Sequence, residues 1–372
     1  MSAKRTSSRR QFLKGQSALD ALAEAAERID PESSSGSAPA PWQGPPPEEA
    51  YLLQFGRRAM ACEFEVFLNA GQYRDGNDAV VEALDLVDRL EDQLTVYRDS
   101  SEISAVNRRA TAESVAVESR LYALLEQAVE LHRQTHRAFD ITSGPLSKVW
   151  GFYRRQGAMP AESDLAAALG LVGSQFLELD PAAQSVRFKK QGVELNLGAI
   201  GKGYALDRAA ESMLAAGVGD FLWHGGQSSI LARGSQATQG AEEPGWLVGV
   251  RHPMRPEKQI IEIRLCNRAL GTSGAGTQFF RHRGKRYGHI IDPRSGWPAE
   301  GVISTTVLAP TAAEADALAT AFYILGPDQA VAWCHERAAI GMLMFLPAKT
   351  RQGVDLITAG VTEQDWRLTG QL

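Results

Sequence analysis

Segments that favour strands and helices do not alternate regularly along this 372-residue chain. Between two helical stretches at 202–216 and 312–325, strand-like segments follow one another with turns between them. A parallel sheet needs a crossover connection, usually a helix, between neighbouring strands. Because there is no such alternation and no internal repeat, we predict an α+β fold with a mixed, largely antiparallel sheet core flanked by helices.

Hydrophobic spacing places the individual elements. MACEFEVFLN at 60–69 alternates like a half-buried strand, and 78–97 has helical spacing with mixed charge on its outer face. Further strands are expected at FLELD and SVRFKK, which form a hairpin, and at VELNL, DFLWHG, SSILARG, GWLVGVRH, QIIEIRL, ALGTSG, YGHIID and STTVLAP. Further helices are expected at 118–135, from Pro145 onward, at 202–216, at 312–325 and at 327–337.

The composition of the chain argues against nucleic-acid binding, a membrane span, a disulfide framework and a zinc site. With 44% hydrophobic residues, a net charge of −5 and dispersed basic residues, the chain is expected to be soluble and globular, with one large domain or two closely packed ones. No basic stripe indicates a nucleic-acid partner, and no apolar stretch reaches the ~18 residues of a transmembrane segment. Cys62, Cys266 and Cys334 lack the spacing of a disulfide framework or a zinc site and are expected to be small buried hydrophobes.

The first 50 residues are expected to precede the folded domain. SSRRQFLKG at 7–15 is similar to a twin-arginine export motif, but the QSALDALAEAAERID that follows carries acids where an apolar h-region is needed. A cytoplasmic location is therefore favoured, and a periplasmic one stays open. The Pro/Ser/Gly-rich stretch at 31–49 is expected to be an extended linker. The main domain is predicted at 51–349, with a tail at 350–372 that adds an edge strand or packs loosely.

LNLGAIGKGYALDRAA at 195–210 combines small residues with one cation. Gly198, Gly201 and Gly203 allow a tight turn and close approach of the backbone. Lys202 supplies a positive charge where a helix begins, and helix N-termini bind anions. The stretch therefore suits a phosphate site, but it matches neither GxGxxG nor a P-loop. A close-packed turn with a surface lysine explains it as well.

Asp316 and Thr320 are four residues apart in a predicted helix, so a carboxylate and a hydroxyl lie on one face. Mg²⁺ prefers hard oxygen ligands and usually takes only one or two carboxylates, sharing the rest of its shell with water and substrate phosphate. A magnesium site is one interpretation. A solvated or capping pair is the other.

Two more polar residues adjoin apolar segments. His289 in YGHIIDPRSGWPAEG is either a polar group at a site or a satisfied core residue. Asp140 in RAFDITSGPLSKVWGF ends a predicted strand and is either a helix cap or a ligand-facing acid.

Taken in order along 52–344, these segments resemble the ApbE family of FAD:protein FMN transferases. The resemblance rests on MACEFEV, LTVYRDSSEISAVNR, FDITSGPLSKVWGF, LGAIGKGYALDRAA, SGAGTQFF, HIIDPRSGWPA and EADALATAFYILG. It implies the ApbE-like fold and a reaction in which Mg²⁺ assists cleavage of the FAD pyrophosphate. The FMN half then passes, through its phosphate, to a Ser or Thr hydroxyl of a target protein, and AMP is released.

The resemblance also implies roles for particular residues. The metal ligands would be Asp316, Thr320 and the backbone carbonyl of Ala199. Lys202 would steady the phosphates, and His289 would accept the proton of the incoming hydroxyl; with Asp316 these are the expected catalytic residues. The FAD pocket would be lined by Met60, Tyr97, Ala138, Phe139, Asp140, Asn196, Lys202 and Ile290, with Asp140 suited to a ribose or adenine hydrogen bond.

The chain departs from the family pattern at three positions. Asn196 stands in NLGAIGKG where the family usually has an aspartate, Gln227 precedes Ser228 where GGD is usual, and SGAGT has Ala275 followed by Gly276 where SGDYE is usual. Neutral residues add no charge to a cation site, so metal affinity is expected to fall. An FAD pyrophosphatase that yields FMN and AMP, or a non-catalytic FAD-binding protein, are the alternatives to the transferase.

Overall fold

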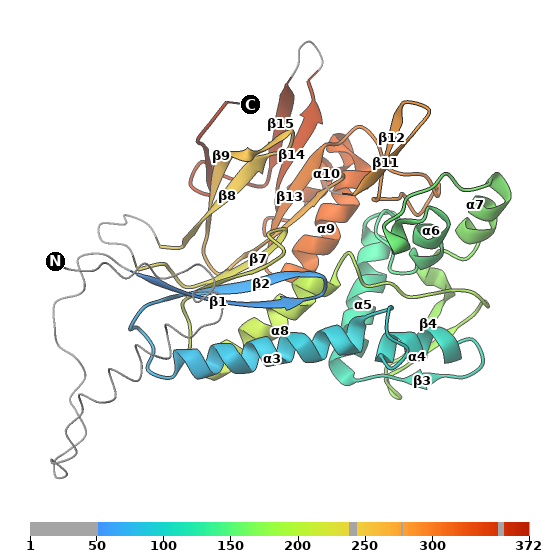
Figure 1. Cartoon of the computed structure of the whole chain (residues 1–372), viewed down its shortest axis with the longest axis horizontal. Coiled ribbons are helices and arrows are strands. Elements are labelled where there is room, and N and C mark those ends of the chain that lie inside the picture. Colours follow the sequence, from blue (N-terminus) through green and yellow to red (C-terminus); the bar gives the residue numbers. More distant parts are fainter. Residues whose placement is uncertain (1–50, 238–243, 277, 349–352, 372) are drawn as a thin grey trace, which may run out of the picture. The chain divides into compact units, whose positions relative to one another are not determined.

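The computed structural model describes residues 51–237, 244–276, 278–348 and 353–371. The predicted twin-arginine-like segment and linker lie outside the described residues. Figure 1 shows the element order, and Glu48–Leu372 forms one compact unit. Among the described residues, no helix combines the length and the apolarity that crossing a membrane requires.

An eight-stranded sheet forms the centre of this unit, and every neighbouring pair of its strands is antiparallel. The predicted antiparallel α+β fold is therefore confirmed. In spatial order the strands are β1 (Leu52–Ala59), β2 (Cys62–Asn69), β6 (Phe221–Gly225), β7 (Ser229–Arg233), β10 (Ala269–Gly274), β13 (Ser304–Ala309), β14 (Gly341–Pro347) and β15 (Val354–Ala359).

Three smaller sheets accompany it. The first contains β16 (Trp366–Leu368), β9 (Arg255–Leu265) and β8 (Trp246–His252), the second contains β3 (Val115–Ala116), β5 (Ser185–Phe188) and β4 (Leu177–Asp180), and the third is the hairpin β11 (Phe279–His282) and β12 (Lys285–Gly288). The helices are α3 (Gly76–Leu94), α4 (Glu102–Arg109), α5 (Ser119–Gln134), α6 (Gly144–Val149), α7 (Glu162–Leu169), α8 (Gly201–Ala215), α9 (Ala312–Leu325) and α10 (Pro327–His335), with short 3₁₀ turns η1 (Phe152–Arg154) and η2 (Ser174–Phe176).

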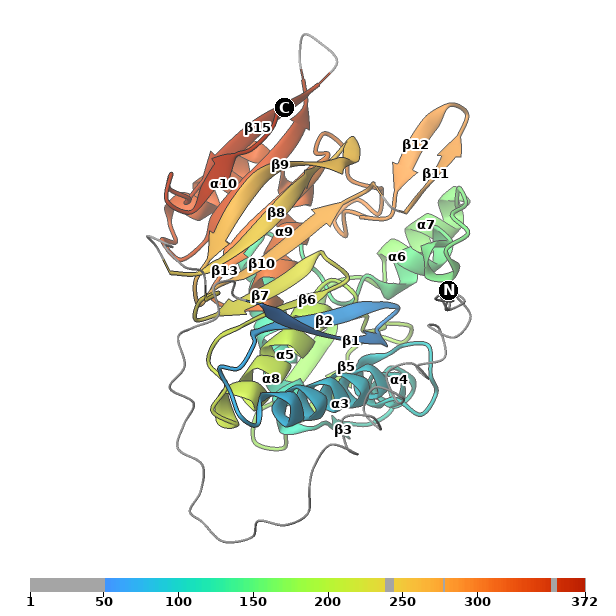
Figure 2. The same cartoon turned by 60° about the vertical axis from the view of Figure 1, so that its left-hand side comes forward.

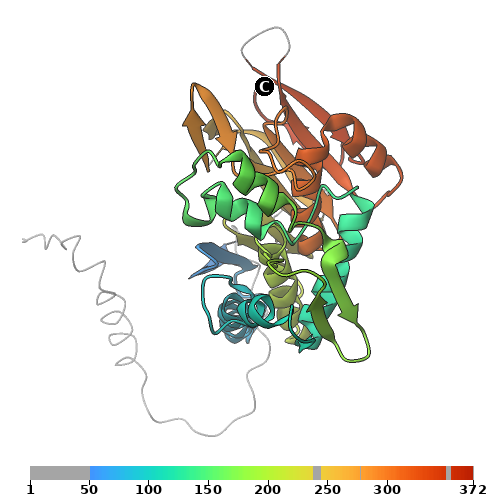
Figure 3. The same cartoon turned by 90° about the vertical axis from the view of Figure 1, so that its right-hand side faces the viewer.

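The two faces of the central sheet pack against different layers, because successive residues of a strand point to opposite sides. On β13, Val307 belongs to a core shared with α3, α5, α8 and α9, whereas Leu308 belongs to a core shared with β8 and β9. Figure 2 shows the helices and the β8–β9 ribbon on these two sides. A third apolar cluster joins α6, α7 and the β11–β12 hairpin around Trp150, and Figure 3 shows these elements side by side.

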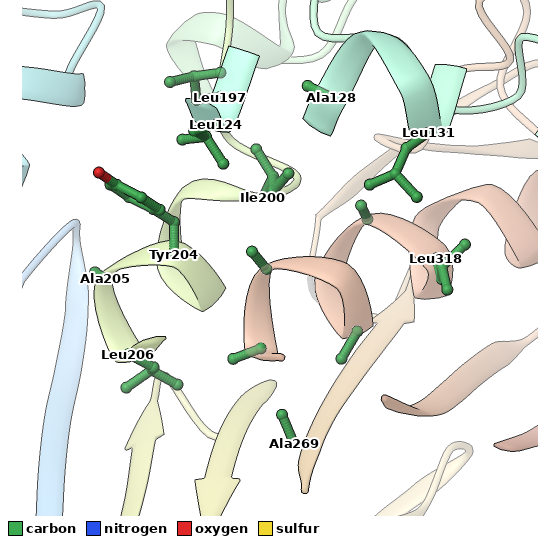
Figure 4. Packing of buried hydrophobic residues seen from close by; sticks show 14 of the residues in the cluster. Leu124, Ala128, Leu131, Leu197, Ile200, Tyr204, Ala205, Leu206, Ala269 and Leu318 are labelled. Carbon is green, nitrogen blue, oxygen red and sulfur yellow. The ribbon is translucent and has the colours of Figure 1, made fainter. Parts of the chain in front are cut away.

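Helices α8 and α9 cross at very short range. A Cβ added at Gly203 would lie 2.1 Å from the carbonyl oxygen of Ala312, and one added at Gly271 of β10 would lie 2.5 Å from that of Ala315. The small side chains of α9 permit this contact, and Figure 4 shows the packing around α8 and α9. Close packing between helices is therefore the reason that Gly203 must be glycine.

Two predicted strands are wrong, and a third, YGHIID at 287–292, is a strand only at Tyr287 and Gly288, the end of β12. Residues 193–197 (VELNL) form no strand, because the side chain of Asn107 pairs with both the amide and the carbonyl of Leu195, at 2.7 Å and 3.0 Å. The segment leading into Asp140 is also not a strand and is organised by side-chain hydrogen bonds. In the predicted tail, β15 is the edge strand of the central sheet and β16 pairs with β9, which is the first of the two alternatives left open for it.

Candidate functional site

A cavity of about 890 Å³ lies where α8, α9, the β6–β7 turn and the end of β10 come together with the segment after β12. Its lining contains many of the predicted site residues. Those that line it are Tyr97, Asn196, Ala199, Lys202, His289, Ile290, Asp316 and Thr320. Residues from four separate stretches of the sequence thus converge on one space, which favours a common binding site.

Asp316 is buried, and its carboxylate accepts hydrogen bonds from neutral groups only. The hydroxyl of Ser229 donates to both of its oxygens, at 2.7 Å and 2.8 Å, and the amide of Gly203 donates to Oδ2 at 2.8 Å. Burial raises the pKa of Asp316 to about 6, although the nearby ammonium of Lys202 opposes that rise. The charge is therefore incompletely compensated by the protein, and a bound cation would complete the compensation.

Lys202 projects from the first turn of α8 into the cavity and donates a hydrogen bond to the hydroxyl of Ser228. Ser228 follows Gly226 and Gln227, which both have positive φ in the β6–β7 turn. The turn thereby sets the position of the ammonium group at the N-terminus of α8. A cation and a helix N-terminus in one cavity favour an anionic ligand.

Thr320 lies one helical turn after Asp316 and lines the same cavity. Its hydroxyl is 3.0 Å from that of Ser273 at the end of β10. Gly203 lies in the first turn of α8, where backbone amides have no acceptor within the helix, and its amide bonds to Asp316. Ala199 lies just before this helix and lines the cavity.

These oxygen donors suit a magnesium ion. A carboxylate, a hydroxyl and a backbone carbonyl are hard ligands, and they leave coordination positions for water and phosphate. Among the described residues, no group of three or more His, Cys, Asp or Glu side chains could hold a metal. An ion at this site would thus depend on a single carboxylate.

His289 lines the cavity directly after the β11–β12 hairpin. Its Nδ1 is 3.1 Å from the carbonyl oxygen of Gln278, which can only accept, so Nδ1 carries the proton and Nε2 is the acceptor of the neutral ring. Burial lowers the pKa of His289. The imidazole is therefore neutral at physiological pH and able to take up a proton.

Three other predicted residues, Met60, Ala138 and Phe139, are absent from the cavity lining. Met60 belongs to the β1–β2 turn, with a φ of 49°, and packs against the main core, while Ala138 and Phe139 are buried. Tyr97, which does line the cavity, is exposed at 67%, and its ring is 4.7 Å from that of Tyr153. The roles of these residues toward FAD stay predictions.

Asp140 is buried in a polar network and is absent from the cavity lining. Its oxygens accept from the amide and hydroxyl of Thr142, at 2.8 Å and 2.7 Å, and from the amide and hydroxyl of Ser174, at 3.2 Å and 3.0 Å. Nδ1 of His132 is 3.0 Å from Oδ2. Against the effect of burial, these partners lower the pKa of Asp140. Its carboxylate holds the segment that leads to Ser143 on the cavity wall, and a contact with ribose or adenine stays a prediction.

The positions that depart from the family pattern differ in location. Asn196 and Gln227 line the cavity, and the side-chain oxygen of Asn196 accepts the amide of Gly198 at 2.9 Å. Ala275 packs against the main core, and its carbonyl accepts a hydrogen bond from Arg286. Two of the three neutral positions are therefore placed to affect a ligand directly.

Several residues of the site were missed from the sequence. Ser229 holds Asp316, Ser273 contacts Thr320, and Asp207 of α8 accepts the amides of Ala312 and Ala313 at 2.8 Å and 2.9 Å. Ser229 directly follows Ser228 in GGQSS, and a polar residue at the start of the apolar run ILA was the available signal. Asp207 had no comparable signal, because its partners are about 100 residues away in the sequence.

Comparisons with known proteins all point to one family. The model of the ApbE family matches residues 60–344. An FAD:protein FMN transferase of Treponema pallidum (strain Nichols) is 32% identical over 283 residues, covering 73% of this chain and 78% of the relative. A flavin transferase ApbE of Vibrio cholerae has a solved structure that is similar with a TM-score of 0.73 at 25% identity, covering 84% of this chain and 98% of that one. The ApbE protein of Thermotoga maritima gives the same TM-score at 27% identity, covering 83% and 97%.

Proposed function

Since the chain belongs to the ApbE family, we propose that it is an FAD:protein FMN transferase that uses Mg²⁺ and modifies a Ser or Thr hydroxyl of a target protein. The activity is supported by the names of its relatives. The observation that carries the proposal for this chain is the buried Asp316, which shares one cavity with Thr320, Lys202 and His289.

The reaction is a phosphoryl transfer. A bond forms between the acceptor hydroxyl oxygen and the phosphorus of the FMN half, and the bond from that phosphorus to the bridging oxygen of the pyrophosphate breaks, so that AMP leaves. Such reactions need positioning and charge neutralisation more than covalent help from the protein. The cavity offers both, because the Lys202 ammonium and the α8 N-terminus face the same space.

His289 would hold the proton that the hydroxyl loses. Its Nδ1–H is bound to the Gln278 carbonyl, so the proton goes to Nε2. A neutral imidazole is the form that can accept it, and the lowered pKa of His289 maintains that form.

Asp316, Thr320 and the Ala199 carbonyl would hold the magnesium ion. When bound, Mg²⁺ neutralises pyrophosphate charge and polarises the attacked phosphorus. Ser229 and the Gly203 amide orient the Asp316 carboxylate, and Ser273 orients the Thr320 hydroxyl. The protein groups are thus arranged before a ligand arrives.

Incubation of the protein with FAD and Mg²⁺ tests the proposal, with the Asp316→Ala variant beside the wild type. AMP and FMN are quantified, and an acceptor protein with a serine or threonine site is examined by mass spectrometry. AMP release with flavin on the acceptor supports the transferase. AMP with free FMN would instead identify a pyrophosphatase, and intact bound FAD would mean that the neutral Asn196 and Gln227 have left a flavin-binding protein.

A further inference from the structure

The β11–β12 hairpin projects beside the cavity and carries a dense positive charge. It begins after Gln278 and ends before His289, and both of these residues line the cavity. Figures 1 and 2 show it standing apart from the central sheet, next to α6 and α7. We propose that the outward face of this hairpin is a docking surface for an acidic segment of the flavin-accepting protein. The proposal rests on the proposed function, because only a macromolecular acceptor needs a surface outside the cavity.

The hairpin is unusually cationic for this chain. Its sequence FFRHRGKRYG has four Lys or Arg residues and no acid, whereas the whole chain has a net charge of −5. In the strand register Arg281 lies opposite Arg286, and His282 lies opposite Lys285. Like charges directly opposite each other destabilise a strand pair. The placement of Arg281 opposite Arg286 therefore does not stabilise the pairing of the two strands.

Internal partners leave part of this charge uncompensated. Lys285 forms an ion pair of 2.7 Å with Glu300, and the guanidinium of Arg286 lies 3.9 Å from the ring centre of Phe279. Within the described ranges, Arg281 and Arg283 have no acidic partner, and both are exposed. These two arginines are thus available to an external anion.

The opposite face of the hairpin is anchored. Phe280 and Tyr287 are paired across the strands with their rings 5.3 Å apart, and both rings lie about 6 Å from that of Trp150, at 6.1 Å and 5.8 Å. A two-stranded hairpin is only marginally stable by itself, so this apolar contact holds it in place. The outward face then presents Arg281, Arg286 and Phe279, which is 42% exposed.

This composition fits a protein partner. Arginine and aromatic residues are enriched in protein–protein interfaces, and complementary charge raises association rates and selects partners. An acceptor must bring its hydroxyl to His289, one residue beyond the hairpin. Acidic residues that flank the modified Ser or Thr would then meet Arg281 and Arg283.

Peptide binding tests the docking surface. The probes are two fluorescein-labelled 15-residue peptides with the same central threonine, one with six aspartates around it and the other with asparagines at those positions. Their dissociation constants are measured by fluorescence anisotropy with the FAD-loaded protein at low and high salt. The wild type is expected to bind the aspartate peptide at least tenfold more tightly at low salt, with the preference reduced at high salt.

Charge variants test whether Arg281 and Arg283 cause the preference for the aspartate peptide. The Arg281→Glu/Arg283→Glu variant is expected to abolish this preference, and the Arg281→Gln/Arg283→Gln variant is expected to reduce it. The matched control Arg74→Glu/Arg187→Glu changes the net charge equally at exposed positions outside the cavity lining and is expected to keep it. No preference in the wild type, or an unchanged preference in the Arg281→Glu/Arg283→Glu variant, would overturn the proposal. Binding of phosphatidylserine vesicles through these arginines without a peptide preference would also overturn it and would identify a membrane surface instead.

AMP release from FAD, measured on the same preparations, separates the two proposals. Normal AMP release by the Arg281→Glu/Arg283→Glu variant, together with a lost peptide preference, supports a docking role for the hairpin. AMP release by a wild type that shows no peptide preference would leave the proposed function standing and remove the docking surface. If the wild type prefers the aspartate peptide but never cleaves FAD, the docking surface would stand and the proposed function would be removed.

Discussion

The backbone amide of Gly203 on α8 donates a 2.8 Å hydrogen bond to Oδ2 of Asp316 on α9. The same glycine lies so close to Ala312 of α9 that a Cβ added to it would be 2.1 Å from the Ala312 carbonyl oxygen. One residue therefore sets both the distance between α8 and α9 and the orientation of the expected metal ligand.

Substitution of Gly203 by alanine is expected to lower both stability and activity. The new Cβ would lie 2.1 Å from the Ala312 carbonyl oxygen, so α8 and α9 must separate. Overpacking of this kind costs about 1–3 kcal/mol, and more where the backbone itself is in the way. Chemical denaturation and the AMP-release assay measure the two effects. Gly201→Ala is the control in the same helix, because its Cβ would have its nearest neighbour at 3.8 Å; equal behaviour of the two variants would contradict the close-contact argument.

Neutralising Asp316 is expected to remove the dependence of activity on Mg²⁺. Asp316→Asn keeps the size of the side chain but cannot compensate a cation, so AMP release should fall by roughly a hundredfold or more while FAD still binds. Titration of activity with Mg²⁺ checks this, and chelation of metal should reduce the wild type to the level of the variant. At Thr320, serine keeps the ligating hydroxyl and valine removes it, so Thr320→Ser should retain Mg²⁺ activation and Thr320→Val should lose it. An Asp316→Asn enzyme with an unchanged Mg²⁺ response would exclude Asp316 as a ligand.

His289→Ala is expected to slow transfer by roughly 10²–10⁴-fold with little change in FAD affinity, as for loss of a general base. The neutral ring is the active form, so its contribution is present above its pKa and lost as the pH falls through it. Because the pKa of His289 is lowered by burial, the wild type should keep this contribution at pH values where an ordinary histidine is half protonated. The pH profile of the transfer rate with a fixed acceptor measures it. A variant that transfers FMN at the normal rate would end the assignment.

Asp207 is expected to make the protein more stable at mildly acidic pH. Burial raises its folded-state pKa from 3.8 to about 6, so the ionised form is disfavoured by folding. This cost is present above pH 6 and is removed as the pH falls from about 6 to 3.8, because the folded state then binds the proton more tightly than the unfolded state. Between about pH 7.5 and pH 4, the stability of the wild type relative to Asp207→Asn should rise by up to about 3 kcal/mol. Denaturation across this pH range, with the exposed Asp78→Asn as control, provides the test; a constant difference would mean that Asp207 titrates normally.

Restoring an acid at position 196 is expected to strengthen metal binding. Asn196 lines the cavity, and an aspartate there can keep the hydrogen bond that the side chain accepts from Gly198. Added negative charge near a cation site raises its affinity, so Asn196→Asp should reach half-maximal activation at a several-fold lower Mg²⁺ concentration. Ala275→Asp is the contrasting variant, because Ala275 lies outside the cavity lining and packs against the core. If Mg²⁺ affinity rises in both the Asn196→Asp and the Ala275→Asp variants, or in neither, the distinction between a position in the cavity lining and one outside it would be contradicted.

The parts of the fold that local patterns govern were predictable from the sequence. Asp316 and Thr320 lie in a helix with clear spacing, so their shared face followed from the i, i+4 rule. The antiparallel sheet followed from the absence of intervening helices. Local patterns could not show that Asn107 would take over the backbone partners of Leu195, which is why that segment was wrongly expected to be a strand.

The site itself was predictable only in part, since much of it depends on distant contacts. The glycines at 198–203 suited either a ligand turn or close packing, and both occur: Gly198 lines the cavity, whereas Gly203 contacts Ala312. Ser229 and Ser273 orient the expected ligands from two strands that no sequence spacing relates to α9. The contacts that orient the ligands therefore became visible only in three dimensions.

The strands of the β11–β12 hairpin hydrogen-bond to each other and, among the described residues, to no larger sheet. Mutations of Arg281 and Arg283 are therefore expected to leave the register of the central strands unchanged. Natural selection can then alter the outward-facing residues of this hairpin while the residues that line the cavity stay the same. The outward face of the hairpin and the residues of the cavity can therefore change independently of each other.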